Sequence, residues 1–100
     1  NILTSINDEN SSFMDFRLEQ NYPNPFNSGT KITWQSPISG HILVRVFNIL
    51  GTEVIKLVDE VKPSGTYEVE FDGSNLSSGV YFYQLVTQNL IQTKKMILLK

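Results

Sequence analysis

The sequence TYEVEFD at residues 66–72 decides how the chain folds. Tyr67, Val69 and Phe71 alternate there with polar or acidic side chains. Successive side chains of a β-strand point to opposite faces, whereas the faces of a helix repeat every 3.6 residues. The stretch therefore predicts a strand with one buried face and one solvated face.

Similar short stretches recur on both sides of this strand, and turn residues such as Gly, Pro and Asn separate them. Alternation places Ile32 with Trp34 on one face of a strand, and Ile42 with Val44 and Val46 on one face of the next. The strands that we expect are residues 30–36, 41–48, 52–58, 66–72, 79–87 and 90–99. A spacing of roughly 8–12 residues is typical of an all-β sandwich, and no window predicts an amphipathic helix.

The segments before and between the strands have the composition of linkers and turns. Residues 1–16 are rich in Asn, Ser and Asp and predict a linker or mobile N-terminal arm, with a first edge strand around residues 13–18 as the alternative. Residues 20–29 (QNYPNPFNSG) hold two prolines, so this segment is extended or turning. Residues 59–65 are polar and contain Pro63, which predicts a connection.

Length and composition bound the classes of function. The chain has 100 residues, enough for one domain. Eight basic against ten acidic residues leave no basic excess for nucleic acid, and no apolar run reaches the roughly 20 residues of a transmembrane helix. The absence of cysteine excludes disulfides and thiolate metal sites, and His41 is the single histidine. Since the sequence starts with Asn, we expect a piece of a longer protein.

Carboxylates offer two weak candidates for chemistry. Glu68, Glu70 and Asp72 share one face of a strand, and paired carboxylates catalyse glycoside hydrolysis. A solvated sheet face explains this pattern better, because nothing supplies a cleft. Residues 72–75 (DGSN) carry oxygens that suit calcium, but a turn with Asx-type hydrogen bonds explains them without a metal. We expect no catalytic site, no metal site and no cofactor.

Aromatic residues offer a third candidate, a platform on which sugars stack. It suggests an accessory carbohydrate-binding module of a secreted enzyme as the alternative function. Aromatics at alternate strand positions are more often core residues, because each buries a large area. The aromatic residues in question are Trp34, Tyr67, Tyr81, Phe82 and Tyr83.

Five blocks of the sequence, taken together, resemble one known family. The first is LEQNYPNPFN at residues 18–27, and the last is TKKMILLK at residues 93–100. The blocks between them are residues 40–54 (GHILVRVFNILGTEV), 63–72 (PSGTYEVEFD) and 76–85 (LSSGVYFYQL). In order and spacing they resemble the type A C-terminal sorting domains of the type IX (Por) secretion system. Ser28 and Ser36 stand where that family often has a proline and an apolar residue.

The resemblance implies an immunoglobulin-like Greek-key β-sandwich of about seven strands over residues 17–100. It implies a non-catalytic secretion signal that follows a covalently attached N-terminal passenger, an enzyme or adhesin. The partners would be the type IX outer-membrane translocon and its C-terminal signal peptidase. The passenger would pass through the periplasm to the cell surface or the medium.

The motif residues carried over from the family are candidates for recognition by the translocon. We expect residues 24–26 to form a rigid extended arm, Gly79 to permit a tight turn, and residues 93–99 to form a terminal strand whose free edge pairs with a partner's sheet. Alternatively, these residues only stabilise the sandwich, and unpaired edges also suggest a weak homodimer. The candidates are Asn24, Pro25, Phe26, Gly51, Gly79, Val80, Tyr81, Lys95, Met96, Ile97, Leu98 and Lys100.

Overall fold

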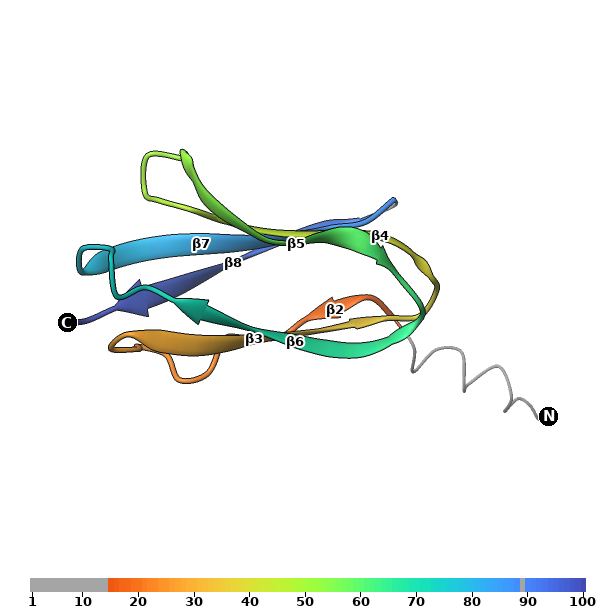
Figure 1. The fold of residues 1–100 in the computed structure, drawn as a ribbon, viewed down its shortest axis with the longest axis horizontal. Coiled ribbons are helices and arrows are strands. Elements are labelled where there is room, and N and C mark those ends of the chain that lie inside the picture. The colour runs from red at the N-terminus through yellow and green to blue at the C-terminus, as the bar shows by residue number, and fades with distance from the viewer. Residues whose placement is uncertain (1–14, 89) are drawn as a thin grey trace.

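The fold is all-β throughout the part of the chain that the computed structural model describes, residues 15–88 and 90–100 (Figure 1). Seven strands run in these ranges, in agreement with the strand number expected from the sequence. They are β2 (Arg17–Leu18), β3 (Gly29–Ser36), β4 (Gly40–Phe47), β5 (Glu53–Lys62), β6 (Gly65–Asp72), β7 (Gly79–Val86) and β8 (Ile91–Leu98).

The strands form two sheets that pack face to face (Figure 1). One sheet has the order β2-β3-β6 and the other has the order β5-β4-β7-β8, and every neighbouring pair is antiparallel. The predicted β-sandwich is therefore confirmed, while its Greek-key description stays a prediction. Within the described ranges, no helix is long and apolar enough to cross a membrane.

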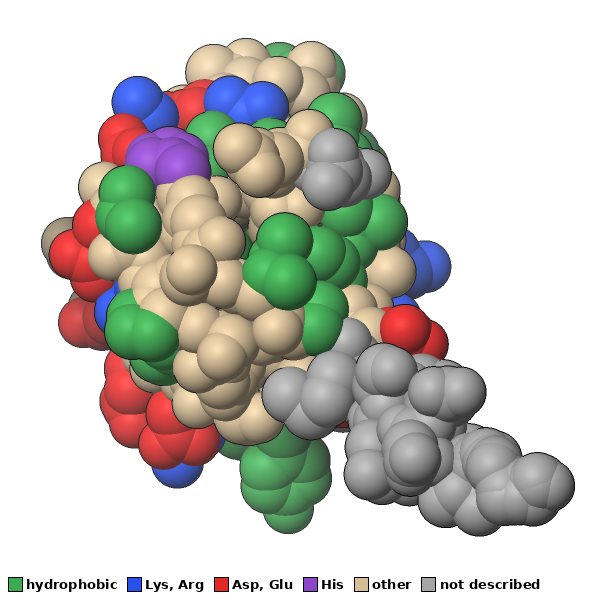
Figure 2. Space-filling model, turned by 90° about the vertical axis from the view of Figure 1, so that its right-hand side faces the viewer, with side chains coloured by type: hydrophobic (Ala, Val, Ile, Leu, Met, Phe, Trp, Pro, Cys, Tyr) green, Lys and Arg blue, Asp and Glu red, His purple; other side chains and the backbone are tan. Residues whose placement is uncertain are grey.

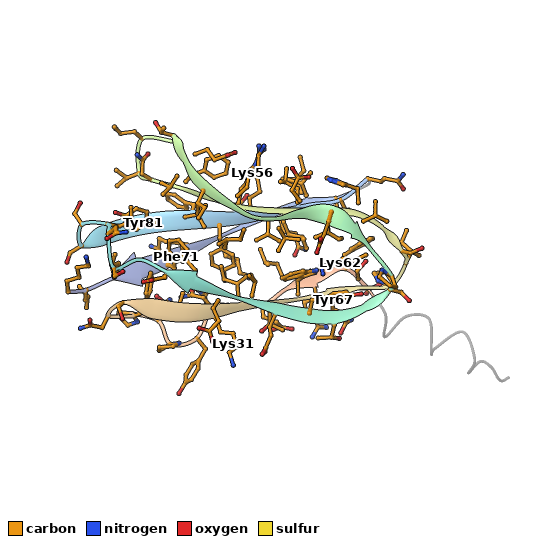
Figure 3. The ribbon with its side chains drawn as sticks, viewed as in Figure 1. Lys31, Lys56, Lys62, Tyr67, Phe71 and Tyr81 are labelled. Atoms are coloured by element: carbon orange, nitrogen blue, oxygen red, sulfur yellow. The ribbon has the colours of Figure 1, made fainter. Side chains whose placement is uncertain are left out.

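The core lies between the sheets and includes Ile32, Trp34, Ile42, Val44, Val46 and Phe71, which the alternation assigned to inner faces. Figure 3 shows Phe71 of β6 and Tyr81 of β7 pointing into this space from opposite layers. Burying such side chains drives the two sheets together, at about 25 cal/mol for each Å² of apolar surface removed from water. The buried apolar residues are Leu18, Phe26, Ile32, Trp34, Ile42, Val44, Val46, Phe71, Tyr81, Tyr83, Leu85, Met96 and Leu98.

Burial of Trp34 confirms the core position that we favoured for this residue and contradicts the alternative in which it stacks on sugars. Its side chain is 1% exposed and stacks on Tyr67 with 5.6 Å between ring centroids. The ammonium of Lys62 lies 4.8 Å from the centre of the Tyr67 ring. These rings therefore fill the core near one end of the sandwich and offer no open platform.

Strand β5 is longer than the sequence predicted. We expected it to end at residue 58, but it continues to Lys62, which pairs with Gly40 across the sheet. The prediction failed because β5 is an outermost strand whose residues are mostly exposed on both faces, so it shows no alternation. Its ladder with β4 holds the polar residues in the strand until Pro63, which has no N–H to donate.

The N-terminal segment agrees in part with the expectations. Residues 1–14 lie outside the described residues, so the predicted linker stays a prediction there. The alternative edge strand is present at Arg17–Leu18, which pairs with Trp34 and Gln35 of β3. Figure 2 views the end of the sandwich at which this segment enters, and charged side chains lie mainly around its margin.

A buried hydroxyl ties the four-stranded sheet to the chain that follows β2. Tyr83 of β7 is fully buried, and its hydroxyl donates a hydrogen bond to the carbonyl of Glu19 over 2.6 Å. The same oxygen accepts a hydrogen bond from the backbone N–H of Asn21 over 2.7 Å. Buried polar groups cost free energy unless they are paired, so this contact holds residues 19–21, which run beside β3, against β7.

We predict that Tyr83→Phe lowers the free energy of unfolding by about 2–4 kcal/mol, because it leaves the buried N–H of Asn21 and the partly buried carbonyl of Glu19 without this partner. Urea unfolding of the full chain measures this change. Tyr67→Phe is the control, because the Tyr67 hydroxyl donates to the carbonyl of Pro63 at an exposed site. An equal loss of unfolding free energy in Tyr83→Phe and Tyr67→Phe would contradict the role given to Tyr83.

Burial of the Tyr83 hydroxyl also predicts that the domain loses stability at alkaline pH. Desolvation raises the pKa of Tyr83 to about 12, against about 10 in the unfolded chain. The unfolded chain therefore loses this proton first, and the stability contributed by Tyr83 is present below pH 10 and is lost as the pH rises towards 12. Urea unfolding at a series of pH values between about 10 and 12 should show a smaller fall in the free energy of unfolding for Tyr83→Phe than for the wild type. Parallel curves for the two proteins would rule the prediction out.

Candidate recognition site

The two end blocks of the sequence motif meet on the outer edge of β8. The backbone N–H of Phe26 donates to the carbonyl of Ile97 over 2.9 Å, and the N–H of Leu99 donates to the carbonyl of Phe26 over 2.8 Å. The side-chain oxygen of Asn24 accepts a hydrogen bond from the N–H of Ile97 over 3.0 Å. Residues 24–26 thus form a short parallel addition to β8, which we call the arm.

A polar cluster positions the arm. Asn21 is 2% exposed, and its amide nitrogen donates to the hydroxyl of Thr30 over 3.0 Å and to the carbonyl of Pro23 over 3.2 Å. The Thr30 hydroxyl in turn donates to the same Pro23 carbonyl over 2.8 Å. Since Tyr83 holds the backbone of Asn21, the cluster connects β7, β3 and the arm.

The arm bends, so its predicted extended form is wrong. The Tyr22–Pro23 and Asn24–Pro25 peptide bonds are both cis, and residues 23–25 form bends. The bends follow from the partners of this segment, because Asn21 and Thr30 both hold the Pro23 carbonyl while Asn24 reaches β8.

Phe26 anchors the arm in the core. Its side chain is 2% exposed and meets Phe71 edge to face, with 6.0 Å between ring centroids. Gly73 leaves room for it, because a Cβ at that position would lie 3.3 Å from the Phe26 ring and 3.2 Å from Leu98. The N–H of Gly73 also donates to the carbonyl of Ser28 over 2.6 Å. A small residue is therefore needed where the arm, β6 and β8 converge.

The last residue of the sequence lies against the loop between β6 and β7. The N–H of Lys100 donates to the hydroxyl of Ser78 over 2.9 Å, and its ammonium donates to the carbonyl of Ser74. Hydrogen bonds from Ser74, followed by the nearby charge of Lys100, hold the pKa of the Asp72 carboxyl below its usual range. Asp72 accepts the Ser74 N–H over 2.9 Å, which confirms the Asx-type turn expected for residues 72–75.

Two further motif residues shape turns at the same end of the sandwich. Gly51 has a φ of 83° and donates its N–H to the carbonyl of Asn48 in the β4–β5 turn. Gly79 is the first residue of β7 and has a φ of 156°, a backbone conformation that residues with a side chain rarely adopt. Two residues later, the hydroxyl of Tyr81 donates to the carbonyl of Ser77 over 2.8 Å and closes the β6–β7 loop.

The predicted recognition residues divide into surface and core. Eight of them are at least partly exposed and can be reached by a partner. They are Asn24, Pro25, Gly51, Gly79, Val80, Lys95, Ile97 and Lys100. The remaining four are buried, and they are Phe26, Tyr81, Met96 and Leu98. For these four side chains, the structure favours the alternative that they stabilise the fold.

Most of the motif lies at one end of the molecule. This end carries the arm, Lys100 and the ends of three pairs of neighbouring strands (Figure 1). The residues paired at these strand ends are Gly29 with Asp72, Phe47 with Glu53, and Gly79 with Leu98. Asp15 lies at the opposite end, where its carbonyl accepts a hydrogen bond from the Gln35 side chain. We call the end that carries the arm the distal end.

The free edge expected of the terminal strand is only partly present. Strand β8 is the outermost strand of its sheet, but the arm already occupies the backbone groups of Ile97 and the N–H of Leu99. The carbonyl of Lys95 also accepts a hydrogen bond from the Gln20 side chain over 2.9 Å. A partner strand can therefore reach this part of β8 only by displacing residues 20–26.

The other candidates for chemistry lie on the surface. Glu68, Glu70 and Asp72 are exposed on β6, and Glu68 pairs with Lys31 over 3.5 Å, as expected of a solvated face. His41 is exposed and contacts Asp59 over 2.7 Å. Over residues 15–88 and 90–100, no three His, Cys, Asp or Glu side chains gather as metal ligands.

Sequence reasoning missed Asn21, Tyr83 and Gly73 as residues that build this site. Asn21 and Tyr83 lie 62 positions apart, and no local pattern links them. The run of polar and proline residues around Asn21 was the one available signal, because a buried asparagine in a turn needs partners.

Comparison with known proteins identifies one family. The sequence model of the secretion system C-terminal sorting domain family matches residues 20–99. This range includes the arm and β3 to β8. No curated protein and no solved structure in the comparisons matches the chain.

We predict that Gly79→Ala lowers the free energy of unfolding by about 1–3 kcal/mol, because side chains rarely adopt this backbone conformation. Gly40→Ala is the matched control, since a Cβ meets nothing within 4 Å at either position and only Gly79 has a positive φ. Thermal or urea unfolding of both variants separates backbone strain from packing. The prediction is wrong if the two substitutions have the same effect.

Proposed function

Since the chain belongs to the family of secretion system C-terminal sorting domains and is a type IX sorting signal, we propose that the outer-membrane translocon reads its folded distal end. A sorting domain of this kind is non-catalytic, and its family serves proteins exported to the cell surface or the medium. The passenger, an enzyme or adhesin, precedes the domain and passes through the periplasm. A C-terminal signal peptidase then releases or processes the exported protein.

One observation carries this proposal: the two end blocks of the motif, more than 70 positions apart, bond directly to each other at the distal end. A receptor that binds there contacts both blocks only when the domain is folded. The passenger side lies at the other end, where Asp15 enters, so a bulky passenger does not obstruct the receptor. Recognition of the folded surface also spares the partner the entropy of ordering a loose segment.

The arm changes how the terminal strand takes part. Bare strand addition along β8 would break the three hydrogen bonds that Asn24 and Phe26 make with Ile97 and Leu99. We therefore favour a receptor that binds the arm and β8 together. Homodimerisation through an edge strand stays a prediction, and the longer outermost strands that the arm leaves uncovered are β5 and β6.

The basic experiment fuses the full 100-residue chain to the C-terminus of a periplasmic fluorescent reporter in a bacterium with a working type IX system. Fluorescence should reach the cell surface or the medium, and it should stay in the periplasm of a translocon mutant. A reporter that stays inside both strains would refute the sorting function. Deleting residues 95–100 is a poor test, because it removes the buried Met96 and Leu98 and disrupts the core.

Asn24→Ala tests recognition of the folded arm, and we predict a several-fold loss of export. The substitution removes the hydrogen bond to Ile97 at an exposed site, at a cost of about 1 kcal/mol in stability. The fraction of reporter exported is measured beside the unfolding curve of the purified chain.

The matched control is Ser36→Ala, which removes the hydrogen bond from Ser36 to the Ile38 carbonyl at the other end of the sandwich. It should lower stability without lowering export. Export that stays level or rises in Asn24→Ala would mean that the translocon reads the bare strand.

A further inference from the structure

The outer face of the four-stranded sheet carries an apolar patch at the distal end. Phe47 of β4 lies opposite Phe82 of β7, and Val80 of β7 lies opposite Ile97 of β8. Val80 and Phe82 are two positions apart on one strand, so all four side chains share one face. Each is only half-buried, although each belongs to a regular strand. We call these four residues the outer patch.

The outer patch borders a row of polar side chains that hydrogen-bond to one another. The guanidinium of Arg45 donates to the side-chain oxygen of Gln84 over 3.1 Å, and Gln84 donates to the Thr93 hydroxyl over 3.1 Å. Arg45 also lies over the Phe47 ring, 5.1 Å from its centre. Because these polar groups bond to one another, a partner can cover the row without leaving them unpaired.

Basic side chains surround the outer patch, although the chain as a whole has a net charge of -2. Lys95 lies opposite Phe82 in the β7–β8 ladder, and Lys56 lies opposite Arg45 in the β4–β5 ladder. Figure 3 shows Lys56 pointing away from the core on this side of the sandwich. Glu53 neutralises Arg45, whereas Lys56 and Lys95 form no ion pair within the described ranges.

The β4–β5 turn extends the apolar surface. Ile49 is 68% exposed and Leu50 is 85% exposed. The turn is rigid, because the side-chain oxygen of Asn48 accepts the N–H groups of Leu50 and Thr52. Figure 1 shows this hairpin end rising away from the three-stranded sheet, on the side of the outer face. A rigid turn that holds two large apolar side chains in water is typical of an anchor for a protein partner.

We propose that the outer patch and the Ile49–Leu50 turn dock onto a protein of the translocon whose contact surface is apolar at its centre and acidic at its rim. The inference rests on the sorting function and names the surface and the chemistry of its partner. Acidic groups suit Lys56 and Lys95, and complementary charge speeds association and fixes orientation. A protein fits this face better than an anionic membrane does, because it can place acidic groups opposite Lys56 and Lys95 alone, whereas lipid charges would also face Glu53 and Asp59 of β5.

The test compares Val80→Thr/Ile97→Thr with the matched control Val61→Thr/Ile91→Thr in the reporter fusion of the full chain. Both pairs make the same chemical change and keep β-branched side chains that suit strands. Val61 and Ile91 are exposed and lie at the end opposite the outer patch. We expect export to fall about tenfold in the first variant, as at an interface hot spot, and to stay at the wild-type level in the control.

A charge reversal gives a second arm of the test. Lys95→Glu should lower export, because it would face the acidic rim, whereas Lys31→Glu on the other sheet should not. Circular dichroism and thermal unfolding of the purified chains check that the outer-patch variant unfolds at the same temperature as its control.

The outcomes separate the inference from the sorting function. A wild-type fusion that is not exported refutes the sorting function itself. If the wild type is exported and the outer-patch variant is exported as well as its control, the outer patch is not the docking surface. Sedimentation of the wild-type chain, but not of Val80→Thr/Ile97→Thr, with phosphatidylglycerol–phosphatidylcholine vesicles would replace the protein partner by a membrane.

Discussion

The hydroxyl of Tyr83 is the constraint on which the rest of the structure depends. A hydroxyl with no exposure to water must find partners inside the protein, and its partners here are the backbone groups of Glu19 and Asn21. This ties the chain after β2, which runs beside β3, to the inner face of the four-stranded sheet. The arm can then reach β8, and Phe26 can fill the space beside Phe71. One buried oxygen thus links the entry segment, the core and the last strand.

The motif of this domain serves both fold and signal, because many of its residues are buried. A receptor cannot touch the side chains of Phe26, Tyr81, Met96 or Leu98 in the folded domain. In our proposal, the receptor contacts what these side chains hold in place, which is the arm, the β4–β5 turn and the outer edge of β8. Substitutions of the buried residues would therefore abolish sorting through loss of the fold. Substitutions of Asn24, Val80 or Ile97 separate the two roles, since their side chains are at least partly exposed.

Local alternation predicted much of the fold. It identified the inner faces of β3, β4 and β6 because in each of these strands the residues of one face are more buried than those of the other. It failed for the end of β5, whose two faces are both largely exposed and whose polar residues resemble a loop. It also failed for the arm, where the partners of Asn21 and Asn24 lie on distant strands. The motif identified the candidate recognition residues, but only the packing shows which of their side chains are exposed to a partner and which are buried.

The edges of the sandwich explain why the arm belongs to the domain. An exposed edge strand is a template for unwanted pairing with other chains. Strands β5 and β6 carry charged residues along their edges, and β2 has only two residues. Strand β8 is apolar near its end, where Met96, Ile97 and Leu98 follow one another, so charge does not protect it there. The arm supplies the missing protection by bonding to the backbone of Ile97 and Leu99. In the proposed route the domain passes through the periplasm before it meets its receptor. A covered β8 would protect it there from unwanted pairing, while the arm, the outer patch and the β4–β5 turn remain open to binding.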